Sequence, residues 1–325
     1  MANLLKNYHP ADLSLWQGRL DANLNEYYYQ IIKPLDLNNS ISLTPGLALL
    51  GFACDEGVRR NLGRPGAIQG SQLIKQCLAK LPLHKEIKIY DAGTISCPDT
   101  DLETAQYNLG FAVTKLLANG FMPIVLGGGH ETAWGHYQGL EPAIEAKSLA
   151  IVNFDAHFDL RNLLIGNKGS SGTPFKQIAQ ARAQKNLPFD YYCLGVQPNS
   201  NSQSLFITAK DLNTHYLLAE KFYHPENPAC STLIKKIINT HDVIYLSICL
   251  DVFSASTAPG VSAPQPLGLQ PFHVLPYLRQ LASSDKLISF DIVELAPNYD
   301  IDNRTAKLAA NLLTEILHHL VPKTH

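Results

Sequence analysis

The chain has 325 residues, of which 46% are hydrophobic and 17% charged, so it can form one large domain or two smaller ones around a sizeable buried core. Its formal net charge of -2 excludes the strongly basic surface that nucleic acids and anionic membranes select. We therefore expect no nucleic-acid partner, no membrane partner, and a small molecule as the ligand.

The N-terminal residues and the cysteines bear on the compartment. Lys6 and His9 have no apolar run behind them, and no stretch of the chain reaches the length of a membrane span. Six cysteines are dispersed along the chain, which argues against a disulfide framework. We expect a cytoplasmic protein whose cysteines are mostly reduced.

Short, continuous apolar runs predict strands that are buried on both faces. These runs are residues 47–52, 87–90, 123–126, 149–154, 191–196, 243–250 and 287–293. Helical periodicity lies between them, for example from Leu102 to Leu117 with Gly120 as a stop, and from Leu308 to Leu320. This alternation predicts an α/β fold, a three-layer α/β/α sandwich with a mostly parallel central sheet.

The domain organisation is predicted to be simple. The chain shows no repeat, no low-complexity tract and no linker long enough to divide it. Residues 197–203 and 258–271 are interpreted as long loops near the edge of the sheet. We expect one domain over residues 1–325, with residues 1–45 as an N-terminal extension packed on it.

Five segments carry acidic or imidazole side chains just after predicted strands. They are residues 54–61, 127–131, 155–159, 247–251 and 291–294. Each one alone has a simple structural interpretation, such as a turn, a capped strand or a solvated loop. Parallel sheets bind ligands outside the carboxyl ends of their strands, and the joint occurrence of these segments at successive strand ends favours one site.

The third of these segments has the pattern of a metal site. Asp155, His157 and Asp159 alternate, so on an extended strand end they point to one side. Together with His130 and Asp251 they offer oxygen and imidazole donors, which suit Mn²⁺ or another divalent ion. Two such ions about 3.5–4 Å apart can share a hydroxide that is nucleophilic at neutral pH.

These motifs resemble those of the ureohydrolase (arginase/agmatinase) family, and within it the formimidoylglutamases. The similarity runs from Leu15–Asp21 through Gly51–Asn61 to Asp291–Glu294 and covers nearly the whole chain. Arginases and agmatinases usually carry an aspartate before the first metal-binding histidine, whereas Gly129 stands there in this chain. The loop Ser170–Phe175 also lacks the histidine that arginases place in that region.

The resemblance implies an arginase-like fold and the hydrolysis of N-formimidoyl-L-glutamate to L-glutamate and formamide, a step of histidine degradation. It further implies two Mn²⁺ ions and, as is common in the family, a homo-oligomer. The metal ligands carried over are His130, Asp155, His157, Asp159, Cys249 and Asp251. Asp155 would bridge the two ions.

Two residues carry catalytic roles by resemblance. Asp159 would orient the hydroxide and take up its proton, and Glu294 would hold the cationic nitrogen group of the substrate. The two carboxylates of the glutamyl part need cationic or amide donors, for which we predict Arg161, Arg60 and Asn61. An arginine at position 161 can equally brace its own loop.

Cys249 departs from the family pattern, which normally reads Ser-x-Asp-x-Asp on this strand and uses the first aspartate as a second bridge. Sulfur is a soft donor, so three outcomes stay open: a weakened dimanganese site, a site for a softer metal such as zinc or iron, or a degenerate site. Two other functions stay open as well, a guanidino-group hydrolase and a metal-binding pseudoenzyme. We favour the formimidoylglutamase type because every other carried-over ligand is present.

Overall fold

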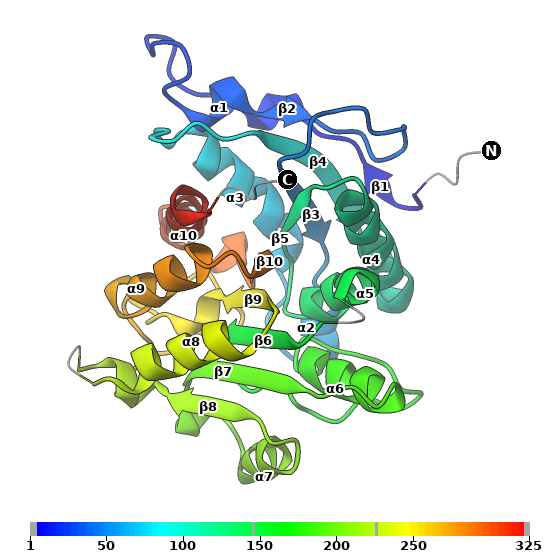
Figure 1. Ribbon diagram of the computed structural model, residues 1–325, viewed down its shortest axis with the longest axis vertical. Helices are drawn as coiled ribbons and strands as arrows, with labels where there is room; N and C mark the ends of the chain where they lie inside the picture. Colours follow the sequence, from blue (N-terminus) through cyan, green and yellow to red (C-terminus); the bar gives the residue numbers. More distant parts are fainter. Residues whose placement is uncertain (1–4, 145–146, 225–226, 322–325) are drawn as a thin grey trace.

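The computed structural model describes residues 5–144, 147–224 and 227–321, and so omits residues 1–4 of the predicted extension. Within the described residues a ten-stranded sheet runs through the molecule in the order β1-β4-β3-β5-β10-β9-β6-β7-β8, with β2 also paired to β4 (Figure 1). Apart from the antiparallel β1, all its pairings are parallel. The strands are β1 (Tyr8–His9), β2 (Lys33–Pro34), β3 (Leu47–Ala53), β4 (Ile89–Ser96), β5 (Met122–Leu126), β6 (Leu149–Phe154), β7 (Asp190–Val196), β8 (His215–Leu218), β9 (Val243–Cys249) and β10 (Leu287–Val293).

Helices cover both faces of the sheet (Figure 1). One face is covered by α3 (Gly70–Ala79), α8 (Ala229–Thr240), α9 (Pro271–Ala282) and α10 (Arg304–His319), and the other by α4 (Leu102–Ala118), α5 (Thr132–Ile144), α6 (Pro174–Gln184) and α7 (Gln203–Asp211). Each helical layer forms its own hydrophobic core with the sheet. The predicted three-layer sandwich with a mostly parallel sheet is therefore confirmed.

Shorter helices lie in the connections between these elements. They are α1 (Tyr28–Ile31), α2 (Glu56–Arg60), and the 3₁₀ helices η1 (Leu13–Leu15), η2 (Ala67–Gln69), η3 (Pro198–Ser200), η4 (Ala219–Phe222), η5 (Leu250–Val252) and η6 (Pro297–Tyr299). In the described part of the chain, every helix is too short or too polar to cross a bilayer.

Strand β4 differs from its prediction, because it continues to Ser96 rather than ending near Tyr90. The polar residue Asp91 marked the expected end, yet its carboxylate is fully buried and paired. It accepts hydrogen bonds from Lys75 Nζ at 2.6 Å and from Trp16 Nε1 at 2.8 Å. Both contacts satisfy the buried charge, and the one from Trp16 joins the N-terminal segment to the sheet. That residues 1–45 form an extension packed on the domain stays a prediction.

The predicted stop of helix α4 is confirmed. The helix ends at Ala118, and Gly120 follows with φ of 78°, the left-handed conformation that glycine adopts without strain. The edge strands β1, β2 and β8 have no counterpart among the predicted strands, because two of them contain only two residues and β8 is half exposed. The apolar-run criterion detects only strands that are buried on both faces.

Candidate active site

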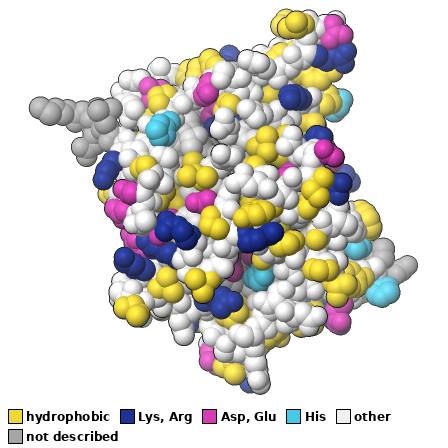
Figure 2. Space-filling view, turned by 180° about the vertical axis from the view of Figure 1, so that it is seen from behind, with side chains coloured by type: hydrophobic (Ala, Val, Ile, Leu, Met, Phe, Trp, Pro, Cys, Tyr) yellow, Lys and Arg dark blue, Asp and Glu magenta, His cyan; other side chains and the backbone are white. Residues whose placement is uncertain are grey.

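The order of the strands brings the acidic segments together. Strands β5, β10, β9 and β6 are consecutive neighbours in the sheet, and the loops that leave their carboxyl ends surround a cavity of about 310 Å³. Figure 2 shows Lys and Arg side chains gathered around a hollow in the middle of one face, with acidic and histidine side chains between them. The cavity is lined by Asn61, Leu62, Gly63, Arg64, His130, His157, Asp159, Arg161, Ser171, Ser200, Asn201, Leu205, Cys249, Asp251, Ser262, Ala263 and Glu294.

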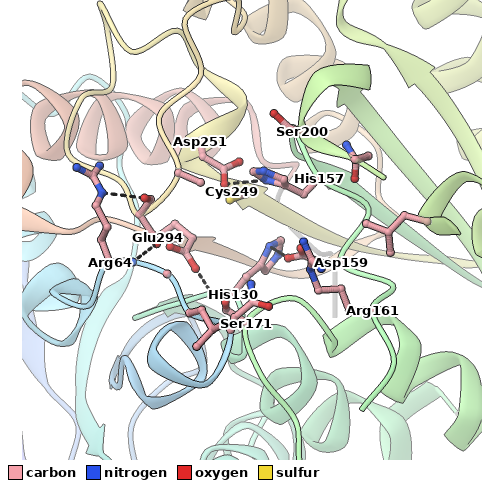
Figure 3. Close-up of a pocket in the computed structure, with 17 residues that line it drawn as sticks. Arg64, His130, His157, Asp159, Arg161, Ser171, Ser200, Cys249, Asp251 and Glu294 are labelled. Carbon is pink, nitrogen blue, oxygen red and sulfur yellow. Dashed lines mark hydrogen bonds and ion pairs between the residues drawn. The ribbon is translucent and has the colours of Figure 1, made fainter. Parts of the chain in front are cut away.

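The imidazole and carboxylate groups predicted as metal ligands meet at the base of this cavity (Figure 3). His130 Nδ1 lies 3.0 Å from Asp155 Oδ2 and 2.9 Å from Asp159 Oδ2. His157 Nδ1 lies 3.1 Å from Asp251 Oδ2 and 3.4 Å from Asp155 Oδ1. Both rings therefore present the same type of nitrogen to the same carboxylate, and Asp155 stands between them.

The donor atoms fall into two groups that share Asp155. One group is His130, Asp155 and Cys249, the other is Asp155, His157 and Asp251, and within each group the ligand atoms lie within 4.8 Å of one another. Such a set fits two divalent ions with a common carboxylate. Three buried polar atoms around it, His130 Nδ1, Asp251 Oδ1 and Glu294 Oε2, make no hydrogen bond in the described structure, which is expected of atoms whose partner is an ion or a ligand.

Backbone and amide donors hold the central carboxylate in place. Asp155 Oδ1 accepts a hydrogen bond of 2.7 Å from the backbone N–H of His157, and Oδ2 accepts one of 3.0 Å from Asn153 Nδ2. Asn153 Nδ2 also donates to Tyr191 Oη at 3.0 Å, and Tyr191 donates to the Phe158 carbonyl. The orientation of Asp155 is therefore fixed before any ligand arrives.

The crowding of buried acids has clear electrostatic consequences. Burial, reinforced by the charge of Asp155, raises the pKa of Asp159 to about 6. Burial, together with the nearby carboxylates of Glu131 and Asp251, raises the pKa of Glu294 well above its ordinary value. Burial also favours the neutral form of Asp155, but the two histidine rings beside it outweigh burial and lower the pKa of Asp155. Cations in the cavity would relieve this repulsion.

The two residues predicted to be catalytic both occupy unusual backbone conformations. Asp159 has φ of 49° and Glu294 has φ of 72°. Most of the other described residues with positive φ are glycine, asparagine or aspartate, which adopt this conformation readily. The two exceptions are Leu62 and Glu294, and both line the cavity. Such conformations cost about 1–3 kcal/mol each and persist where the surrounding structure enforces them, as at binding and catalytic sites.

Glu294 is anchored on one side and free on the other. Its Oε1 atom accepts a hydrogen bond of 2.8 Å from the backbone N–H of His130, which ties the ends of β5 and β10 together. Its Oε2 atom has no hydrogen-bond partner among the described residues, although the side chain is buried and lines the cavity. This oxygen is available to a cationic ligand group beside the donor cluster.

Arg161 lies on the wall of the cavity (Figure 3), and Asn61 lines it as well. A side chain on Gly172 would put its Cβ 2.8 Å from Arg161 Cδ and 2.9 Å from Asn61 Oδ1, so this glycine leaves the space in which both side chains lie. The Arg161 backbone N–H is bound to the Gly172 carbonyl at 2.9 Å. No acidic side chain of the described residues forms an ion pair with the Arg161 guanidinium.

Arg60, also predicted to bind the substrate, does not line the cavity in this structure. Its guanidinium pairs with Glu56 at 2.8 Å and with Glu103 at 2.6 Å, and it also donates to the carbonyls of Thr100 and Gly169. All of its donor positions thus face acceptors of the protein. The sequence around Arg60 did not indicate that its guanidinium is engaged in this way, because all of its acceptors except Glu56 come from distant segments.

Other cavity residues carried no sequence signal strong enough to select them. Ser200 and Asn201 follow β7, and Ser262 lies in the long loop after β9. Arg64 donates to the carbonyls of Val261 and Ser262 and stacks on a tyrosine ring, so it joins two loops at the rim. Isolated serines and amides are common in loops, and only the folded chain shows which of them face the site.

Comparisons with known proteins identify the family. Residues 45–319 match the arginase family. The formimidoylglutamase of Legionella pneumophila (strain Paris) is 45% identical over 96% of this chain and 98% of its own length, and that of Clostridium tetani is 41% identical over 96% of each. The crystal structure of Trypanosoma cruzi formiminoglutamase with Mn²⁺₂ is similar in fold, with a TM-score of 0.77 and 24% identity over 85% of this chain and 93% of that one.

The chain belongs to the arginase family. The resemblance deduced from the sequence, including the similarity to formimidoylglutamases within the family, is thereby confirmed. The arginase-like fold is confirmed as well.

Cys249 is the point at which this member departs from the usual ligand set of the family. The structure brings it to the cavity, in one donor group with His130 and Asp155. Burial, together with the carboxylates of Asp155 and Asp251, raises the pKa of its thiol well above the ordinary value. Metal coordination is the interaction that would ionise it.

We predict that Cys249→Asp tightens Mn²⁺ binding by tenfold or more and lowers the preference for Zn²⁺ over Mn²⁺. The physical reason is that a hard carboxylate replaces a soft sulfur in the donor group of His130 and Asp155. Titrations of the metal-free protein with each ion measure both quantities. Cys230→Ala, a buried cysteine of α8, serves as the control. Equal affinity and selectivity in Cys249→Asp and the parent chain would show that residue 249 does not contact the ions.

Proposed function

We propose that this chain hydrolyses N-formimidoyl-L-glutamate to L-glutamate and formamide. The relatives that are 41–45% identical to it over nearly their whole length are named formimidoylglutamases. The observation that carries the proposal is the charge arrangement of the cavity: the free carboxylate oxygen of Glu294 lies beside the donor cluster, and the Arg161 guanidinium lies on the wall. A substrate with one amidinium and two carboxylates fits that arrangement.

The metal part of the proposal is a pair of Mn²⁺ ions. His130, Asp155, Asp159 and Cys249 would hold one ion, and Asp155, His157 and Asp251 the other. Oxygen and imidazole donors suit manganese, and a solved relative from Trypanosoma cruzi contains it. Divalent ions held in this way lower the pKa of a coordinated water and supply a nucleophile near neutral pH.

The chain's own carboxylates account for binding and proton transfer. Glu294 Oε2 accepts a hydrogen bond from an amidinium N–H and holds the amidine carbon next to the donor cluster. Asp159, whose pKa is about 6, is ionised near neutral pH and takes up the proton that the attacking water releases. The bond from the amidine carbon to the glutamate nitrogen breaks, and the water oxygen stays in formamide. Asp159 passes the water proton that it took up to the glutamate nitrogen, and the second water proton also ends there, so the glutamate leaves with an ammonium group.

The glutamyl part of the substrate would bind at the wall of the cavity. The Arg161 guanidinium offers paired donors to a carboxylate, and the Asn61 side chain offers its amide in the same space above Gly172. Arginine and agmatine lack a second carboxylate, so they gain less from such a wall. A homo-oligomer, which the family resemblance implies, stays a prediction.

We predict that the purified protein, loaded with Mn²⁺, converts N-formimidoyl-L-glutamate into equimolar glutamate and formamide. Product detection by NMR measures both compounds and separates this activity from that of a guanidino hydrolase. Arginine and agmatine are the comparison substrates. A higher kcat/KM for urea release from either of them would overturn the proposal, and the absence of turnover from a metal-loaded protein would identify a pseudoenzyme.

We predict that Glu294→Gln lowers kcat/KM by about 10²–10³-fold, because loss of one partner of a buried charge pair costs roughly 2–5 kcal/mol. Metal content should stay unchanged, since Glu294 belongs to neither donor group. Steady-state kinetics and metal analysis of the same preparation measure the two effects together. Loss of metal in this variant would make Glu294 a ligand instead.

We predict that Arg161→Ala lowers kcat/KM for N-formimidoyl-L-glutamate by about 10–100-fold, the value of a charge-assisted hydrogen bond of about 1.5–3 kcal/mol. Turnover of an N-alkylformamidine without carboxylates should stay the same. The matched control is Arg59→Ala, which removes an exposed arginine that pairs with Glu56. If both substrates lose activity equally in Arg161→Ala, the arginine braces its loop and does not bind the carboxylate.

A further inference from the structure

A chain of buried hydrogen bonds begins behind the His130 ring, on the side away from the cavity. His130 Nε2 lies 2.9 Å from Ser247 Oγ, and Ser247 Oγ donates to Asp291 Oδ1 at 2.6 Å. The three side chains come from the loop after β5, from β9 and from β10, and none is more than 1% exposed. Neither Ser247 nor Asp291 lines the cavity.

The second oxygen of the same carboxylate is also fully engaged. Asp291 Oδ2 accepts a hydrogen bond from the Tyr245 hydroxyl and lies 2.7 Å from His136 Nδ1. On its other side, His136 Nε2 lies 2.7 Å from Ser289 Oγ, and Ser289 donates to the Pro123 carbonyl at 2.6 Å. His136, Ser289 and Asp291 are all fully buried.

The number of hydroxyl and ring hydrogens in this series of hydrogen bonds determines which atom donates in each of them. A serine has one hydroxyl hydrogen, and that of Ser289 goes to a carbonyl, so His136 Nε2 must donate to Ser289 Oγ. His136 Nδ1 and Asp291 Oδ2 share the hydrogen of their contact, so His136 and Asp291 form one buried hydrogen-bonded pair.

The same count applies on the side of His130. The hydroxyl hydrogen of Ser247 goes to Asp291, so Ser247 Oγ accepts the hydrogen of His130 Nε2. The nitrogen left without a fixed hydrogen is Nδ1, the atom that faces Asp155 and Asp159. The hydrogen bond to Ser247 therefore determines both the orientation of the His130 ring and which ring nitrogen faces the donor group.

We propose that Ser247 and Asp291 are positioning residues of the metal centre, which lock His130 in the form that presents the Nδ1 lone pair to an ion. The inference rests on the metal-binding part of the proposed function. Metal-binding histidines usually donate their second N–H to a carboxylate or a carbonyl, and the loss of that partner typically weakens metal binding about 10–100-fold. Here a serine hydroxyl stands between the ring and the carboxylate, and His136 contacts the other oxygen of that carboxylate.

The position of Ser247 on its strand supports this role. Alternate residues of a strand share a face, so Ser247 and Cys249 project from β9 to the same side, one behind the His130 ring and the other into the donor group. Asp291 pairs with Ser247 across the β9–β10 ladder. Adjacent strands therefore supply the ligand and its support in a fixed register.

The test compares Ser247→Ala with Ser289→Ala. Both variants remove one buried hydroxyl from the same hydrogen-bond chain, but Ser289 has no contact with His130. We expect Ser247→Ala to weaken Mn²⁺ binding to the purified chain about 10–100-fold by calorimetric titration, and Ser289→Ala to change it less than about threefold. Ser247→Thr, which keeps the hydroxyl, should restore the affinity.

A second measurement examines the ring itself. In ¹⁵N-labelled metal-free protein, histidine ring correlations report which nitrogen carries the hydrogen. We expect Nε2 of His130 to be protonated throughout the titration range in the parent chain, and a mixture of ring forms in Ser247→Ala. The melting temperature of each metal-free variant shows whether it is folded.

The outcomes separate this inference from the proposed function. Wild-type Mn²⁺ affinity in a folded Ser247→Ala, or an equal loss in Ser289→Ala, would overturn the positioning role. A parent chain that binds Mn²⁺ but releases no formamide would refute the proposed activity, and the predicted contrast between the two serine variants would still support the positioning role.

Discussion

The repulsion among carboxylates at the ends of three neighbouring strands, β10, β9 and β6, is the constraint on which the rest of this structure depends. Asp155, Asp159, Asp251 and Glu294 share one small buried space, and desolvation with mutual charge raises the pKa values of Asp159, Asp251 and Glu294. Without metal, the two histidine rings beside Asp155 compensate part of this cost and lower the pKa of Asp155. The fold thus holds a cluster of buried carboxylates that is electrostatically unfavourable without metal and would be stabilised by bound cations.

The parallel sheet makes that arrangement possible, because neighbouring strands end at the same edge and each carries a ligand at its last residues. Backbone strain is concentrated at the same edge. Asp159 and Glu294 adopt positive φ, and the hydrogen bond between Glu294 and the His130 backbone holds two strand ends together. The energy that the hydrophobic layers supply on both faces of the sheet allows such conformations to persist.

The sequence predicted the metal-ligand candidates that follow the strands. It did not predict the roles of side chains whose partners lie far away in the sequence. Asp155, His157 and Asp159 meet at the site as their alternation predicted, but they lie in the loop after β6 and not on an extended strand end, and Asp159 has φ of 49°. Arg60 and Arg161 could not be told apart, because the acids that engage Arg60 include one 43 residues away. The role of Asp291 was equally hidden, since it depends on Tyr245 and His136, which meet it only across the folded sheet.

Two departures from the arginase pattern, at Gly129 and Cys249, both make the site less negatively charged. Gly129 replaces an aspartate, and a side chain there would put its Cβ 2.1 Å from Glu131 Oε2, so the glycine and the buried glutamate depend on each other. Burial raises the pKa of Glu131 to about 7, which leaves that acid only partly ionised at neutral pH. Cys249 removes a second aspartate. Arginine carries a net positive charge and N-formimidoyl-L-glutamate a net negative one, so a less anionic site with Arg161 at its wall favours the second substrate.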